Sequence, residues 1–149
     1  MNASSQAITP ELASKIAYLA VLFRTAFPGS TVDLTPWLSD AETQCQLESC
    51  SIDLSFYLPQ KVELLACRCI LMQVHFSEDL LAANCQIETV QAYGYSGQIY
   101  PEEQWQFSTT DWAFAGPSLP RGEHQERFKS LVNSIFRLFE HTNQVNTSG

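Results

Sequence analysis

Two cysteines separated by a single residue, Cys67 and Cys69, are the first residues of this sequence whose type and spacing suggest chemistry. Alternate residues on a β-strand share a face, so both sulfurs could bind a metal ion, with His75 further along that face. A zinc site, however, needs four convergent ligands, and paired cysteines in such sites are usually two or more residues apart. The remaining cysteines, at positions 45, 50 and 85, form no second tight pair. Core packing is therefore the favoured role of all five thiols, and we expect no metal and no cofactor.

A catalytic cysteine would also need a base close to the thiol. His75 lies on the same predicted strand as Cys69, but about 20 Å away along an extended chain. The other two histidines, His124 and His141, fall at the ends of the last predicted helix, where solvation or capping accounts for them. The sequence therefore indicates no cysteine-based catalysis.

Three polar residues in the long apolar run from 61 to 76 are candidates for lining a pocket. Arg68 interrupts this run and needs an anionic partner if it is buried. An internal ion pair, or a side chain that reaches solvent at the sheet edge, is favoured over an anion-binding site. With Gln73 and His75, Arg68 could supply the convergent polar groups of a pocket between sheet and helices.

A pair of acids, Asp53 and Glu63, could face each other across the short connection at Pro59–Gln60. Paired carboxylates can act as general acid and base. Both residues fall on a face that the alternation pattern predicts to be solvated, so solubility is the favoured explanation.

Aromatic residues are concentrated near the end of the predicted sheet. Seven lie close together: Tyr93, Tyr95, Tyr100, Trp105, Phe107, Trp112 and Phe114. Tyr95, Tyr100 and Trp105 border a glycine-containing turn, and aromatic side chains on turns are typical of protein-recognition sites. The adjacent acids Glu102 and Glu103 favour a basic partner, with self-association as a second possibility. The competing interpretation is that all seven rings pack in the core or at its rim.

Two helices should position these residues. Thr9 and Pro10 have the types expected at a helix N-cap and first turn, and the helix they predict spans residues 10–27. Because this helix is apolar around much of its circumference, we expect it to be more buried than the last helix. The last helix, at 123–141, has one apolar face. That face consists of Phe128, Leu131, Val132, Ile135, Phe136, Leu138 and Phe139.

Alternating and apolar runs predict strands between the two helices. The runs are 31–34, 51–58, 61–76, 85–95, 104–107 and 111–115, with a bulge or turn near Thr109 and Thr110. The run 61–76 is apolar on both faces and predicts a central strand covered on both sides. Short connections favour antiparallel pairing. The expected fold is a single two-layer α+β domain with a sheet of four to six strands packed against both helices, and with disordered ends at 1–8 and 143–149.

Composition and charge narrow the classes of function. The 149 residues carry 8 basic and 16 acidic side chains, for a net charge of −8, and 13 of the acids precede Arg121. Such an acidic body repels phosphate groups, which argues against nucleic acid and anionic membranes as partners. No apolar run approaches the length of a membrane helix, and the first residues do not match a secretory signal. We therefore expect a cytoplasmic protein.

The sequence contains none of the common nucleotide-binding, serine-hydrolase, metalloprotease or EF-hand motifs. The order helix–strands–helix and the acidic composition are similar to those of small dimeric secretion chaperones. That resemblance implies a chaperone-like protein that binds another protein. The predicted function is a non-enzymatic protein-interaction or assembly factor, which could be a homodimer. The alternatives are a small-molecule-binding or enzymatic domain with a pocket between sheet and helices, and a small subunit of a larger complex.

Overall fold

The computed structural model describes residues 1–37, 50–59, 64–96 and 102–140. Its helices in this part of the chain are α1 (Ala3–Gln6), α2 (Pro10–Ala26) and α4 (Gly122–Glu140), and its strands are β1 (Thr31–Asp33), β2 (Ser51–Tyr57), β3 (Cys69–Phe76), β4 (Ile87–Tyr95), β5 (Glu103–Ser108) and β6 (Ala113–Ala115). The six strands form one antiparallel sheet in the order β1-β2-β3-β4-β5-β6. The predicted α+β class is confirmed.

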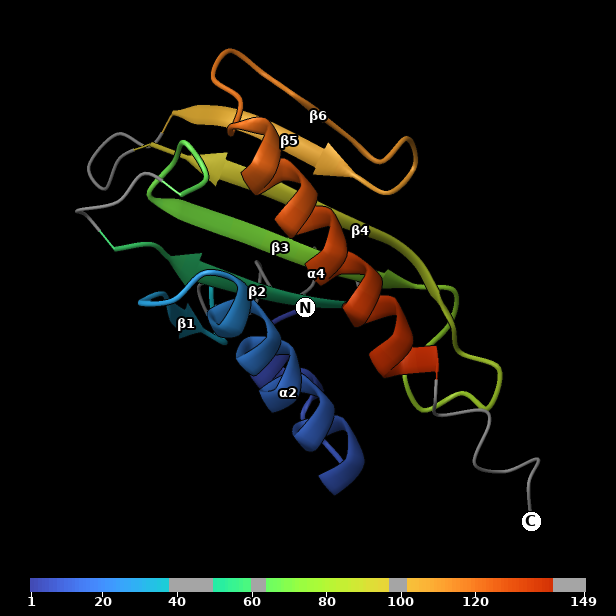
Figure 1. Cartoon of the computed structure of the whole chain (residues 1–149). Coiled ribbons are helices and arrows are strands. Elements are labelled where there is room, and N and C mark those ends of the chain that lie inside the picture. Colours follow the sequence, from blue (N-terminus) through green and yellow to red (C-terminus); the bar gives the residue numbers. More distant parts are fainter. Residues whose placement is uncertain (38–49, 60–63, 97–101, 141–149) are drawn as a thin grey trace.

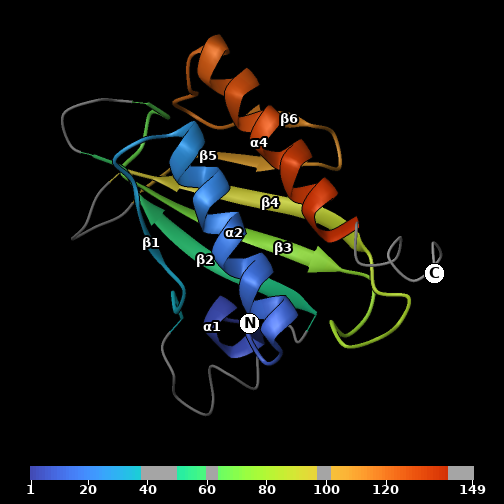
Figure 2. The ribbon, with the colours of Figure 1, turned by 60° about the horizontal axis from the view of Figure 1, so that its bottom comes forward.

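Both long helices lie on one face of the sheet, as predicted, and they pack side by side (Figures 1 and 2). We call this the helix face and the opposite one the outer face. The core fills the space between the helices and the sheet. There the ring of Phe23 from α2 stacks on Phe56 from β2, with centroids 3.8 Å apart. Phe128 of α4 contacts the rings of Trp105 and Phe107 from β5 edge-on.

The central strand β3 is shorter than predicted and is covered differently. Its alternate residues Ile70, Met72, Val74 and Phe76 are buried against the helices, whereas those on the outer face are only half-buried. The prediction of a strand covered on both sides over 61–76 is therefore wrong. Residues 64–68 are irregular, and Ala66 has a φ of 54°, a left-handed conformation that interrupts a strand.

The two long helices differ in their solvent-facing sides. Thr9 caps α2 as predicted, because its Oγ1 accepts a hydrogen bond from the backbone N–H of Leu12 at 3.1 Å. The expectation that α2 would be more buried than α4 is wrong. Tyr18 and Val21 of α2 are each 52% exposed, whereas the exposed positions of α4 are polar.

Within the described residues, no helix is both long enough and apolar enough to cross a membrane.

The N-terminal residues are ordered against the sheet, which corrects the prediction for 1–8. Asn2 forms a parallel bridge with Asp53 of β2, and the N–H of Asp53 donates to the carbonyl of Met1 at 2.8 Å. Ala3, in α1, is fully buried in the core. The other predicted disordered end, 143–149, lies outside the described residues.

The connection between β5 and β6 is a tight turn, as predicted near Thr109 and Thr110. The side-chain oxygens of Ser108 and Thr110 are hydrogen-bonded at 2.8 Å, and the N–H of Trp112 donates to the carbonyl of Ser108 at 2.9 Å. Trp112 has a φ of 54°. This reversal returns the chain to place Phe114 opposite Phe107.

Candidate functional site

The predicted aromatic site around the β4–β5 turn does not assemble as expected. Trp105 is fully buried on the helix face, and its Nε1–H donates to the carbonyl oxygen of Leu65 at 2.7 Å. Its assignment as a surface interaction residue is therefore wrong. Tyr95 is half-buried on the outer face, where burial raises the pKa of its hydroxyl. Tyr100 lies outside the described residues.

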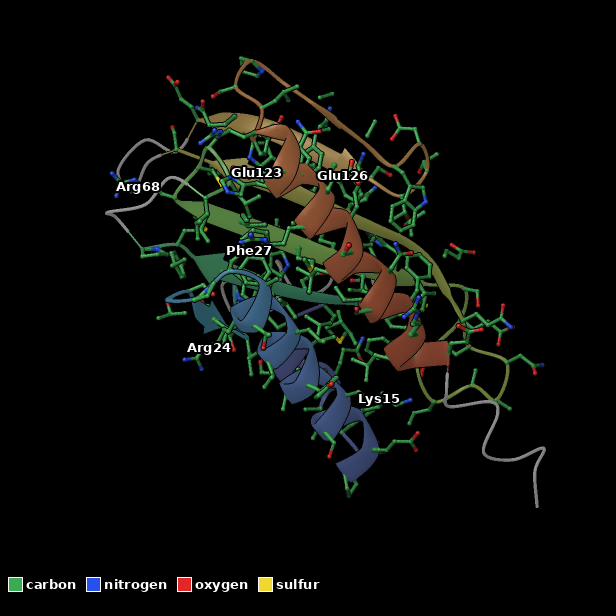
Figure 3. The ribbon with its side chains drawn as sticks, viewed as in Figure 1. Lys15, Arg24, Phe27, Arg68, Glu123 and Glu126 are labelled. Atoms are coloured by element: carbon green, nitrogen blue, oxygen red, sulfur yellow. The ribbon has the colours of Figure 1, made fainter. Side chains whose placement is uncertain are left out.

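The three polar pocket candidates do not converge between sheet and helices. Arg68 is exposed in the segment before β3, and Figure 3 shows it at the end of the molecule. Gln73 and His75 are half-buried on the outer face of β3, on the side of the sheet away from the helices. The predicted pocket lined by Arg68, Gln73 and His75 is therefore wrong, since strand alternation directs Gln73 and His75 away from the helix layer.

Asp53 is buried rather than solvated, which corrects the prediction from strand alternation. It is 1% exposed, and its Oδ2 lies 3.0 Å from the ammonium of Met1 and 2.6 Å from the indole Nε1 of Trp37. The amide nitrogen of Gln73 lies 3.4 Å from the same oxygen. Glu63, its proposed acidic partner, lies outside the described residues. Asp53 therefore joins the N-terminus to the sheet, which is a structural role.

The thiols that the structure describes are poorly suited to nucleophilic chemistry. Burial, reinforced by the neighbouring Cys69, raises the pKa of Cys67 to about 12. Burial is also the largest cause of the raised pKa values of Cys69 and Cys85. Of the four cysteines that the structure describes, Cys67 is buried and Cys50, Cys69 and Cys85 are partly exposed, so core packing does not account for all of them. Cys45 lies outside the described residues. Among the described residues, no group of three or more His, Cys, Asp or Glu side chains could hold a metal ion.

We expect Cys67 to resist alkylation in the folded protein. A pKa raised from 9.0 to about 12 lowers the thiolate fraction at neutral pH, so its reaction with iodoacetamide should be roughly a thousandfold slower than that of an ordinary thiol. Mass spectrometry after timed labelling at neutral pH measures this rate. The same protein in urea is the control, because unfolding should make Cys67 react as a free cysteine does. Rapid labelling of Cys67 in the folded protein would show that the thiol is accessible and activated.

A groove lies where the first turn of α2, the end of β3 and the last turn of α4 meet. Its volume is about 560 Å³, within the range of ligand-binding sites. Phe76 and Phe139 pack edge-to-face in its lining, with centroids 5.2 Å apart, and Leu12 lines it from α2. Leu80 and Leu81 line it from the β3–β4 connection. We call this site, defined by these five residues, the end groove.

The β3–β4 connection is held in place by its own hydrogen bonds. The N–H of Ser77 donates to the carbonyl of Gln86 at 2.8 Å, and the N–H of Gln86 donates to the Oγ of Ser77 at 3.1 Å. Asp79 accepts a hydrogen bond from the N–H of Leu81 at 3.0 Å. These contacts position Leu81 while leaving it 62% exposed. Together with Leu12, Leu80, Phe76 and Phe139 it forms a contiguous apolar surface, which is a feature of binding sites.

The charges around the end groove are mainly acidic. Glu11 is exposed at the start of α2, and Glu78 and Asp79 are exposed in the β3–β4 connection. Glu78 lies close to the groove, because the thiol of the groove residue Cys85 contacts the backbone carbonyl of Glu78 at 3.4 Å. The nearby cation, Lys15, already pairs with Glu11 at 3.4 Å and lies 5.7 Å from the centroid of the Phe139 ring. The rim therefore favours a partner with positive charge.

The end groove does not follow from the sequence pattern, in which residues 77–84 fall between two predicted strands. One signal was available. Leu80 and Leu81 form an apolar pair in a segment that begins with polar residues and follows a strand. The groove also depends on three segments that are distant in the sequence, and no local pattern reveals their proximity.

Comparison with known proteins identifies the family but not the activity. A family model described as a domain of unknown function matches residues 4–141. The chain therefore belongs to this family. No curated protein and no solved structure matches it.

Proposed function

We propose that this member of a family of domains of unknown function is a non-enzymatic protein-interaction or assembly factor. The end groove binds an apolar segment of a partner protein whose flanking residues are basic. The observation that carries this proposal is an apolar groove of about 560 Å³ beside a leucine that is 62% exposed. Apolar side chains of the partner would pack against Phe76, Phe139 and the two leucines, where they would lose contact with water.

The chemistry of the lining favours a polypeptide over a reacting small molecule. Enzyme sites combine a pocket with convergent polar groups of perturbed pKa. The polar side chains that line the end groove do not combine in this way, because Lys15 pairs with Glu11 at 3.4 Å and burial raises the pKa of Cys85, which keeps its thiol neutral. The acids Glu78 and Asp79 instead suit the basic flanks of a peptide, and attraction of this kind adds specificity and speeds association.

Binding of fluorescein-labelled peptides tests this proposal. The probes are peptides with a leucine- and phenylalanine-rich centre, flanked either by lysines or by glutamates. Fluorescence polarisation should show binding of the lysine-flanked set only, and the binding should weaken as salt is added. We expect Leu81→Glu to weaken it about tenfold or more, since the change places a charge where apolar contact is made.

Leu119→Glu is the matched control, because Leu119 is also an exposed leucine, at 46%, and does not line the groove. Both variants should keep the melting temperature of the original protein, since neither side chain is buried. The proposal is wrong if no peptide of either set binds, or if Leu119→Glu weakens binding as much as Leu81→Glu. Strong binding of an uncharged apolar dye in the groove, without any peptide binding, would favour the small-molecule alternative.

A further inference from the structure

The solvent-facing side of α2 is apolar at its centre and charged at its ends. We call it the α2 stripe, and its exposed residues are Glu11, Ser14, Ala17, Tyr18, Val21, Arg24 and Thr25. They recur every three or four positions and so lie along one side of the helix. Tyr18 and Val21, both 52% exposed, occupy its middle. Figure 3 shows Arg24 projecting from α2 on the side away from α4, whereas Lys15 points towards the end of α4.

The neighbouring helix shows that this pattern is specific to α2. Both helices belong to one layer and face the same solvent, yet α4 exposes charged and amide side chains along its outer side. Those residues are Glu123, Glu126, Arg127, Asn133, Arg137 and Glu140. A helix that is apolar on its outer side commonly has a further surface to cover it.

We propose that the α2 stripe binds the same stripe of a second copy of this chain, in an antiparallel pair with two-fold symmetry. The order of residues in the stripe identifies this occupant. We place the two-fold axis between Ala17 and Tyr18. Each residue before the axis then lies level with the partner's residue that follows the axis by the same number of positions. The large ring of Tyr18 then lies against the small side chain of the partner's Ala17.

The same placement matches size and charge along the rest of the stripe. Val21 lies beside the partner's Ser14, again a larger residue against a smaller one. Glu11 lies beside the partner's Arg24 at both ends, so the symmetry creates two opposite-charge pairs. Arg24 has no ion-pair partner among the described residues of its own chain. Glu11 and Arg24 lie about 140° apart around α2, at 100° per residue, so each pair crosses the seam diagonally, which the length of these two side chains allows.

Charge reversal tests this pairing by sedimentation velocity. We expect the original protein to dimerise with a dissociation constant in the micromolar range, because one helix pair buries an area at the low end for specific interfaces. Glu11→Arg and Arg24→Glu should each weaken the dimer about tenfold or more, since each places like charges opposite each other. An equal mixture of the two variants should recover a heterodimer, because both end pairs become complementary again.

Arg121→Glu is the control, as it makes the same charge change at a side chain that is 80% exposed and outside the stripe. It should leave the dimer intact. The proposal is overturned if the original protein remains a monomer at about 0.1 mM, a concentration well above the expected dissociation constant. It is also overturned if both single variants dimerise normally, or if they fold but their mixture does not associate. Arg24 does not line the end groove, so Arg24→Glu should bind the lysine-flanked peptides normally, and the two proposals can fail separately.

Discussion

Trp105→Ala is expected to lower the free energy of unfolding by roughly 3–5 kcal/mol, the largest effect of any single change considered for this protein. The ring is fully buried and contacts Phe114 and Phe128, so its removal leaves a cavity in the core. It also leaves the carbonyl of Leu65 without its indole donor. Urea unfolding followed by circular dichroism measures the loss.

Trp105→Phe separates the hydrogen bond from the packing. It keeps an aromatic ring but removes the indole N–H, so we expect a smaller loss, of roughly 1–3 kcal/mol. The backbone shows how closely the indole fits: a Cβ added at Gly94 would lie 2.4 Å from Cε2 of Trp105. An unchanged unfolding free energy for Trp105→Ala, together with loss of partner binding, would restore Trp105 as a surface interaction residue.

Asp53→Ala is expected to destabilise the protein by roughly 1–3 kcal/mol, because removing the buried carboxylate takes a hydrogen-bond acceptor from the groups that contact it. Those groups are the ammonium of Met1 and the indole N–H of Trp37. The loss should be accompanied by faster hydrogen exchange in α1, since the contact between Asp53 and Met1 joins this end of the chain to β2.

Glu88→Ala is the matched control for Asp53→Ala, because Glu88 is an exposed acid on β4 and its removal changes the charge equally. We expect Glu88→Ala to change the free energy of unfolding by no more than about 0.5 kcal/mol. Asp53→Asn keeps the shape of the side chain and removes its charge. Its loss of unfolding free energy should therefore lie between those of Asp53→Ala and Glu88→Ala. An equally small effect for Asp53→Ala would mean that the carboxylate contributes nothing to the N-terminal attachment.

The helices and several strands could be predicted because their signals are local. The Thr9 cap and the Pro10 start determine where α2 begins, and the structure places it at Pro10–Ala26. The apolar period after Glu123 predicts α4 to within one residue at each end. The strand at Ser51–Tyr57 likewise follows from alternation alone.

The errors came from contacts between residues far apart in the sequence. Alternation places Asp53 on a solvated face, but the N-terminal residues and Trp37 cover it. The apolar run before β3 suggested a longer strand, but it contains the left-handed Ala66. Its place after a glycine-containing turn predicts a surface position for Trp105, whereas its strand position directs it into the core.

The candidate sites were harder to predict than the fold. The end groove requires the start of α2, the end of α4 and the β3–β4 connection to meet, and these segments are separated by long stretches of sequence. The sequence shows the apolar residues of the α2 stripe, but only the structure shows which side of α2 the sheet and α4 leave exposed. In both cases the sequence shows which residues are apolar, but it does not show which of them are exposed to solvent.

Site-specific photo-crosslinking tests the central claim, that the end groove binds a partner protein, most directly. The photoreactive residue benzoylphenylalanine replaces Leu81 in the full chain, expressed in its native host, and replaces Leu119 in a control. Illumination should attach a partner at position 81 and not at 119, and mass spectrometry should locate the attachment in an apolar segment flanked by lysine or arginine. Equal crosslinking at both positions, or attachment to a segment with acidic flanks, would contradict the account.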